Sequence, residues 1–116
     1  MSVKSVRFET EYRVADADVR ISIRIGDGQF GTSFMTLADR TFGPGDIEDV
    51  LLGPGRELTG RELLVKSIVT DVNDMTNRTS ISYELAGGEA PASHVLVASV
   101  EEDGGSVVYR TRIRFQ

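Results

Sequence analysis

The chain has 116 residues, which is enough for one domain with a packed core, and its 40% apolar and 27% charged composition is that of a globular protein. It contains no cysteine, which excludes disulfides, thiolate catalysis and cysteine-ligated zinc, and its net charge of −5 argues against nucleic acid as the main partner. No apolar run approaches the roughly 18–20 residues of a membrane span, and residues 1–7 lack the apolar core of a secretion signal. We therefore expect a single cytoplasmic domain over residues 1–116, and the excess of arginine over lysine favours a bacterial source.

Apolar and polar residues alternate with a period of two along most of the chain, which is the pattern of half-buried β-strands. Residues 6–14 place Val6, Phe8 and Tyr12 on one face, and residues 19–25 alternate valine and isoleucine with arginine and serine. Residues 63–72 are apolar on both faces, which predicts a central strand. The full set of predicted strands is 6–14, 19–25, 29–37, 63–72, 79–85, 95–100 and 107–115.

The segment from Asp46 to Leu52 does not follow this pattern, and it is flanked by two Gly-Pro-Gly turns. Asp46 is suited to cap a short helical turn over residues 46–52, with Gly53 just after its C-terminus. A short edge strand fits the same residues equally well. In either case, seven or eight short strands predict an all-β fold, an antiparallel β-sandwich of the Ig-like or Greek-key type.

Most of the carboxylates fall in four polar breaks between the predicted strands, at residues 16–18, 39–49, 71–74 and 101–103. If successive strands alternate in direction, and if residues 46–52 form a strand, all four breaks lie at one end of the sandwich. Carboxylates gathered on loops are the ligands that Ca²⁺ requires, and such a site would use Asp16, Asp18, Asp71 and Asp74. The alternative is that these residues only form turns, because Asp and Asn side chains cap their own backbones. We favour this alternative and assign no metal, catalytic or cofactor-binding residue.

Two other features resemble motifs of enzymes. Residues 26–31 match the G-x-G-x-x-G pattern and resemble the glycine loop of protein kinases, which covers the phosphates of ATP. The chain has no H-R-D or D-F-G element, so we interpret residues 26–28 as a hairpin turn. His94 is the only histidine, and no G-x-S-x-G element accompanies it, so we do not expect it to act as a general base.

Arginines mark the polar faces of the first two predicted strands and of the last one. These residues are Arg7, Arg13, Arg20, Arg24, Arg110, Arg112 and Arg114. If the strands are neighbours, the arginines form a basic patch, but Glu9 and Glu11 are placed to pair with them, as is usual on a sheet.

The sequence therefore predicts a non-catalytic interaction or binding module without a cofactor. Its expected partner is another protein, or a second copy bound through a sheet edge. A calcium-dependent binding module is the alternative, and a small carboxylate-based hydrolase or carbohydrate-active domain is the second alternative.

Overall fold

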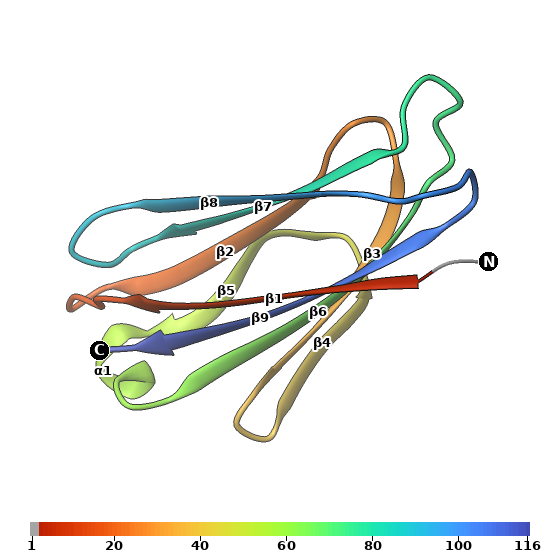
Figure 1. Cartoon of the computed structure of the whole chain (residues 1–116). Helices are drawn as coiled ribbons and strands as arrows, with labels where there is room; N and C mark the ends of the chain where they lie inside the picture. Colours follow the sequence, from red (N-terminus) through yellow and green to blue (C-terminus); the bar gives the residue numbers. More distant parts are fainter. Residues whose placement is uncertain (1–2) are drawn as a thin grey trace.

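The computed structural model describes residues 3–116, which form a sandwich of two β-sheets (Figure 1). Within this range the chain forms nine strands, and a four-residue helix, α1 (Gly55–Leu58), separates the fifth strand from the sixth. The strands are β1 (Val3–Tyr12), β2 (Asp18–Ile25), β3 (Phe30–Leu37), β4 (Arg40–Gly45), β5 (Ile47–Pro54), β6 (Glu62–Thr70), β7 (Arg78–Ala86), β8 (Ala92–Ser99) and β9 (Ser106–Phe115).

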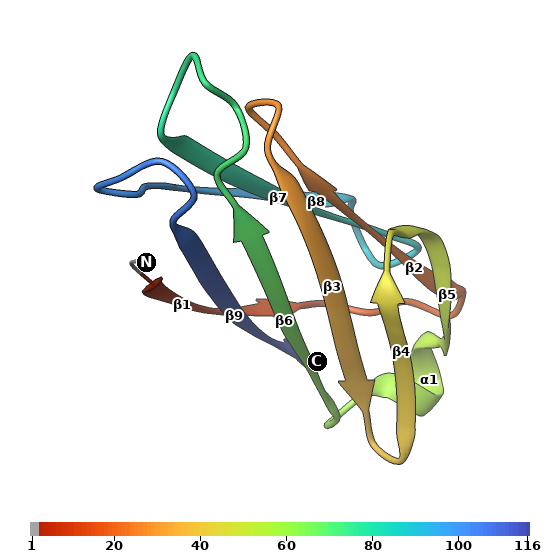
Figure 2. The same ribbon diagram turned by 90° about the vertical axis from the view of Figure 1, so that its right-hand side faces the viewer.

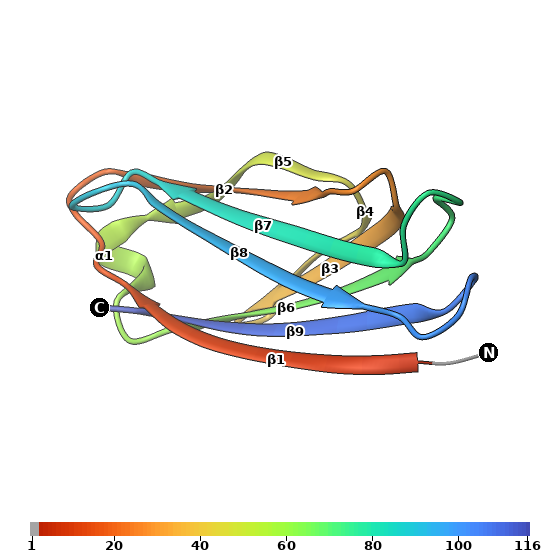
Figure 3. The same cartoon turned by 45° about the horizontal axis from the view of Figure 1, so that its top comes forward.

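A five-stranded sheet, in the order β1-β9-β6-β3-β4, packs against a four-stranded sheet, in the order β5-β2-β7-β8. Figure 3 shows the two layers, with β8 above β1 along one side. The strand pairs are antiparallel except for β1 and β9, which run parallel from Val3–Ser106 to Tyr12–Phe115. The β-sandwich predicted from the sequence is confirmed, with nine strands in place of seven or eight and one parallel pair.

The core between the sheets is formed by the apolar residues of the alternating pattern, together with a few paired hydroxyl groups. Tyr83 and Tyr109 are fully buried, and each meets a threonine of the opposite sheet. Thr111 donates to the Tyr83 hydroxyl at 2.9 Å, and the hydroxyls of Thr79 and Tyr109 lie 2.6 Å apart. These hydrogen bonds satisfy polar groups that would otherwise be buried without partners.

Residues 40–54 differ from the sequence prediction, because they form two strands. Residues 40–45 form β4, which pairs with β3, and residues 47–54 form the edge strand β5 beside β2. The helical turn proposed for residues 46–52 is therefore wrong and the edge-strand alternative is right. Gly53 has φ of +137° within β5 and does not end a helix. The short helix begins only after Pro54.

The turn at residues 26–28, interpreted from the sequence as a hairpin, instead carries the chain from one sheet to the other, as does the connection at residues 100–105. Residues 26–29 join β2 to β3, and residues 100–105 join β8 to β9, and in each case the two strands belong to different sheets. Asp27 and Gly28 both have positive φ, so residues 26–28 do form a tight turn. Hairpins of adjacent strands occur between β3 and β4 and between β7 and β8.

The loops fall into two groups at opposite ends of the long axis (Figures 1 and 2). The α1 end contains α1, the β1–β2 and β7–β8 loops and Gln116. The far end contains residues 26–29, 71–77 and 100–105. The molecule measures 45 × 25 × 20 Å along its principal axes. No helix in residues 3–116 has the length and apolar character needed to cross a membrane.

Candidate functional site

Three of the four acidic breaks are divided between the two ends of the molecule, and the fourth, residues 39–49, is mostly β4 and the start of β5. Asp16 and Asp18 lie at the α1 end, whereas Asp71 and Asp74 lie at the far end with residues 101–103. The expectation that all four breaks share one end is therefore wrong. The cause is β4, because one unrecognised strand reverses the direction assigned to every later strand. A single ion cannot contact all four of the aspartates proposed from the sequence.

At the far end, three polar side chains from two loops do come together. Asp71 is only 4% exposed, and its backbone N–H donates to the Gly105 carbonyl at 2.9 Å. The side-chain amide of Asn77 lies between two carboxylates, and its nitrogen can donate to Asp71 Oδ2 at 2.8 Å and to Asp103 Oδ1 at 2.7 Å. Asp71 Oδ1 is buried and has no hydrogen-bond partner in the described structure. Of these three residues, only Asp71 belonged to the calcium site considered from the sequence, and the central position of Asn77 was not predicted.

The buried side chain of Gln29 makes four of the hydrogen bonds that hold the 71–77 loop and the start of β7. The Gln29 amide nitrogen donates to the carbonyls of Thr76 and Arg78 at 3.1 and 3.0 Å. Its oxygen accepts from the backbone N–H groups of Val72 and Asn73 at 2.8 and 2.9 Å. Gln29 lies in the glycine-rich segment, whose conformation is thus explained by contacts within the protein rather than by a phosphate.

The remaining residues considered from the sequence lie apart from this cluster. Asp16 is exposed and lies 3.5 Å from Arg56. Asp74 is exposed on the 71–77 loop. Among residues 3–116, no three His, Cys, Asp or Glu side chains gather as a metal site. His94 is half-buried, with its ring 5.2 Å from that of Phe8, and its Nε2 has no hydrogen-bond partner in residues 3–116.

The four sheet edges differ in how they are protected from pairing with another chain. β1 carries Arg7, Glu9 and Glu11, and β4 is short and contains Pro44. β5 pairs irregularly with β2 and carries Glu48 and Asp49. Charges, proline and bulges are the features that block edge-to-edge pairing.

The fourth edge, β8, has none of these features in its own sequence, and the one charge bonded to it, Lys4 of β1, lies at its last residue, Ser99. It is eight residues long, contains no charged residue or proline, and pairs with β7 without a register shift. Val95 and Val97 are 62% and 48% exposed on it. The Ser99 carbonyl accepts from Lys4 Nζ at 3.1 Å. The Ser99 carbonyl therefore points away from β7, and backbone N–H and C=O groups of alternate residues in a strand point to the same side. The backbone groups of Val95 and Val97 thus also face the unpaired edge. The uncharged stretch from Ala90 to Val100 was the signal available in the sequence.

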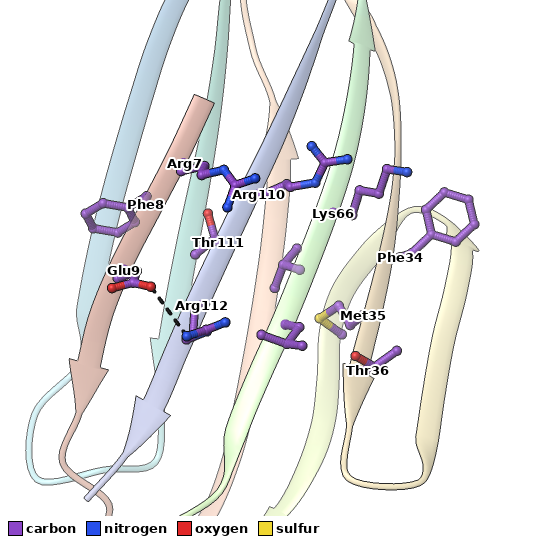
Figure 4. A pocket seen from close by; sticks show the side chains of 12 residues that line it. Arg7, Phe8, Glu9, Phe34, Met35, Thr36, Lys66, Arg110, Thr111 and Arg112 are labelled. Atoms are coloured by element: carbon purple, nitrogen blue, oxygen red, sulfur yellow. Dashed lines mark ion pairs between the residues drawn. The ribbon is translucent and has the colours of Figure 1, made fainter. Parts of the chain in front are cut away.

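The outer face of the five-stranded sheet carries the basic residues of β1 and β9 (Figure 4). Arg112 lies 3.6 Å from Glu9 and 3.4 Å from Glu62, and Arg114 lies 4.0 Å from Glu11. The predicted pairing of Glu9 and Glu11 with arginines is thus confirmed. The first two strands are not neighbours, so β2 adds nothing to this face. Its Arg20 and Arg24 pair instead with Asp49 and Glu84 in the other sheet.

The chain was compared with protein-family models, curated proteins and solved structures, and none of them matches it. The function is therefore inferred from the molecule alone.

Proposed function

We propose that the protein is a non-catalytic interaction module that binds a further β-strand along the β8 edge, and that this strand is β8 of a second copy. The observation that carries the proposal is the contrast between β8 and the other three edges. β1, β4 and β5 each have a feature that opposes strand addition, whereas β8 is regular, uncharged and partly apolar. An exposed edge of this kind is a template for pairing.

Self-pairing fits β8 because a two-fold axis brings the strand antiparallel to its own copy. Each protomer has a net charge of −5, so contacts between copies generally repel. An uncharged strand avoids this repulsion at the contact. One pair of strands buries less than the roughly 1,200 Å² of a standard interface, so we expect a reversible dimer rather than a permanent one.

The test is sedimentation velocity over a concentration series with two matched variants. Val95→Lys places a charge on the β8 edge, and two copies bring these charges together across the two-fold axis. Val72→Lys makes the same change at a valine of similar exposure, 58% against 62%, on the 71–77 loop. We expect the wild type and Val72→Lys to dimerise, and Val95→Lys to weaken the dimer about tenfold or more. A wild type that stays monomeric at the highest concentration, or equal effects of both variants, would exclude the proposal.

The Asp71 cluster supports a second candidate function, calcium-dependent binding at the far end. If the amide of Asn77 turns by half a rotation, its oxygen joins those of Asp71 and Asp103, and three oxygens converge. Oxygen ligands are what Ca²⁺ prefers. The specific observation in favour is Asp71 Oδ1, the second oxygen of that carboxylate, which is buried and unpartnered in the described structure and would gain a partner if the carboxylate bound a cation through both oxygens. The residues proposed for this site are therefore Asp71, Asn77 and Asp103, without Asp16, Asp18 and Asp74.

Thermal melts with excess chelator and with millimolar Ca²⁺ test this candidate. Calcium at about 100 times its dissociation constant stabilises the folded state by roughly 2.7 kcal/mol, which raises the melting temperature by several degrees. Asp103→Asn should abolish the shift, and Asp16→Asn, at the α1 end, should leave it unchanged. If the wild type melts at the same temperature in both buffers, Asn77 acts only as a hydrogen-bond donor to the two carboxylates.

A further inference from the structure

Three cationic side chains form one row across neighbouring strands of the five-stranded sheet. Arg7 on β1 lies opposite Arg110 on β9, and Arg110 lies opposite Lys66 on β6. Phe34 on β3 lies opposite Lys66 and continues the row. Figure 4 shows the four side chains one after another on the same face of the sheet. With strands about 4.8 Å apart, the three charges span roughly 10 Å.

This row lacks the counterions that the rest of the face has. No carboxylate of residues 3–116 lies within ion-pair distance of Arg7, Lys66 or Arg110. The arginines of the following rows, Arg112 and Arg114, are each paired with glutamates. Like charges directly opposite on a sheet destabilise it. The protein thus has three adjacent positive charges without compensation, although its net charge is −5.

The row borders a hollow in the sheet surface with a volume of about 400 Å³. The hollow is lined by the three cations Arg7, Arg110 and Lys66 and by the apolar Phe34 and Leu64. Glu9 and Arg112 also line it, and they pair with each other at 3.6 Å. Phe34 is half-buried and Leu64 is 44% exposed, so both present apolar surface to the hollow. This volume is in the range of small-molecule sites, which are roughly 300–1,000 Å³.

We propose that this hollow binds a small organic phosphate or sulfate that carries a ring. The oxyanion would lie between Arg110 and its neighbours, because guanidinium groups bind such oxygens through paired hydrogen bonds and lysine adds a point charge. The ring would pack on Phe34 and Leu64. The site lies on the sheet that does not contain β8, so it is independent of the proposed dimer.

The experiment is a titration followed by the backbone amide NMR signals of the full chain. Three probes separate the two halves of the ligand: phenyl phosphate, inorganic phosphate and benzyl alcohol. We expect phenyl phosphate to shift the signals of residues 34, 64, 66 and 110 and to bind more tightly than either other probe. Shifts confined to other parts of the chain, or equal affinity for phenyl phosphate and inorganic phosphate, would overturn the proposal.

Two variants of equal charge provide the control. Arg110→Gln removes the centre of the row and should weaken phenyl phosphate binding at least tenfold. Arg13→Gln removes another exposed arginine without an ion pair in the described structure, and should leave binding unchanged. At low salt Arg110→Gln should also raise the melting temperature, because it relieves repulsion from Arg7 and Lys66. Equal loss of binding in both variants would show nonspecific attraction and refute the site.

Discussion

Alkaline pH should destabilise the protein through one core tyrosine. Tyr83 is fully buried between the sheets. Burial raises the pKa of its hydroxyl from 10.0 to about 12, against the opposing effect of the hydrogen bond from Thr111 and with a smaller contribution from the neighbouring Tyr109. Ionisation of Tyr83 in the folded state would place a phenolate in the apolar core, which is why the proton is retained.

The sign of the effect follows from proton binding in the two states. The unfolded chain loses the tyrosine proton near pH 10, whereas the folded chain keeps it until about pH 12. Between these values the unfolded state binds fewer protons, so the free energy of unfolding decreases as the pH rises. A difference of about two pKa units corresponds to about 3 kcal/mol, fully present below pH 10 and lost between pH 10 and about pH 12.

Urea unfolding at a series of pH values measures this effect, with Tyr83→Phe as the comparison. Phenylalanine has no proton to lose, so the free energy of unfolding of this variant should decrease less steeply above pH 10. Ionising groups distant from residue 83 are common to both proteins and cancel in the difference, whereas Tyr109, whose pKa burial also raises, is coupled to Tyr83. If the two proteins lose stability in parallel up to pH 12, the buried hydroxyl of Tyr83 does not control the alkaline transition.

Three further predictions concern the stability of the fold. Gln29→Ala removes four hydrogen bonds at the 71–77 loop and should cost about 2–4 kcal/mol in urea unfolding, with faster hydrogen exchange at residues 72 and 73. Gly87→Ala should lower the free energy of unfolding by well over 2 kcal/mol, because an added Cβ meets the Asp18 carbonyl. Gly104→Ala is also at positive φ but in open space, and should lower the free energy of unfolding by only about 1 kcal/mol. Glu62→Gln removes the partner of two exposed arginines and should cost less than about 1 kcal/mol in the same assay, since such pairs are screened by water.

Most strands were predictable because each has one apolar and one polar face. Arg40–Gly45 was not, because this segment has a single large apolar residue, Phe42, together with two glycines and Pro44. It becomes a strand because it pairs with β3. The alternation of residues within the segment itself does not reveal this pairing. The omission of this one strand then reversed the assigned ends of the later loops, and with them the supposed grouping of Asp16 and Asp18 with Asp71 and Asp74.

The candidate sites were predictable only in part, for a related reason. Arg7 and Arg110 were recognised as outward-facing, but their row with Lys66 and Phe34 depends on the register of four strands. Register is set by pairing between segments far apart in the chain, which alternation within one segment does not report. The same holds for Asn77, whose amide meets Asp103 of another loop.

The parallel pairing of β1 with β9 gives the sandwich a directional resistance to force. β1 begins at the far end with Val3, and β9 finishes at the α1 end with Phe115, so a pull on these two residues in opposite directions runs along both strands. The hydrogen bonds between them, evenly spaced in a parallel pair, are then loaded together in shear rather than opened one by one. A pull across the β7–β8 hairpin, by contrast, would separate bonds in sequence from its open end. The fold is therefore expected to resist stretching along its length far better than peeling from the side of β8.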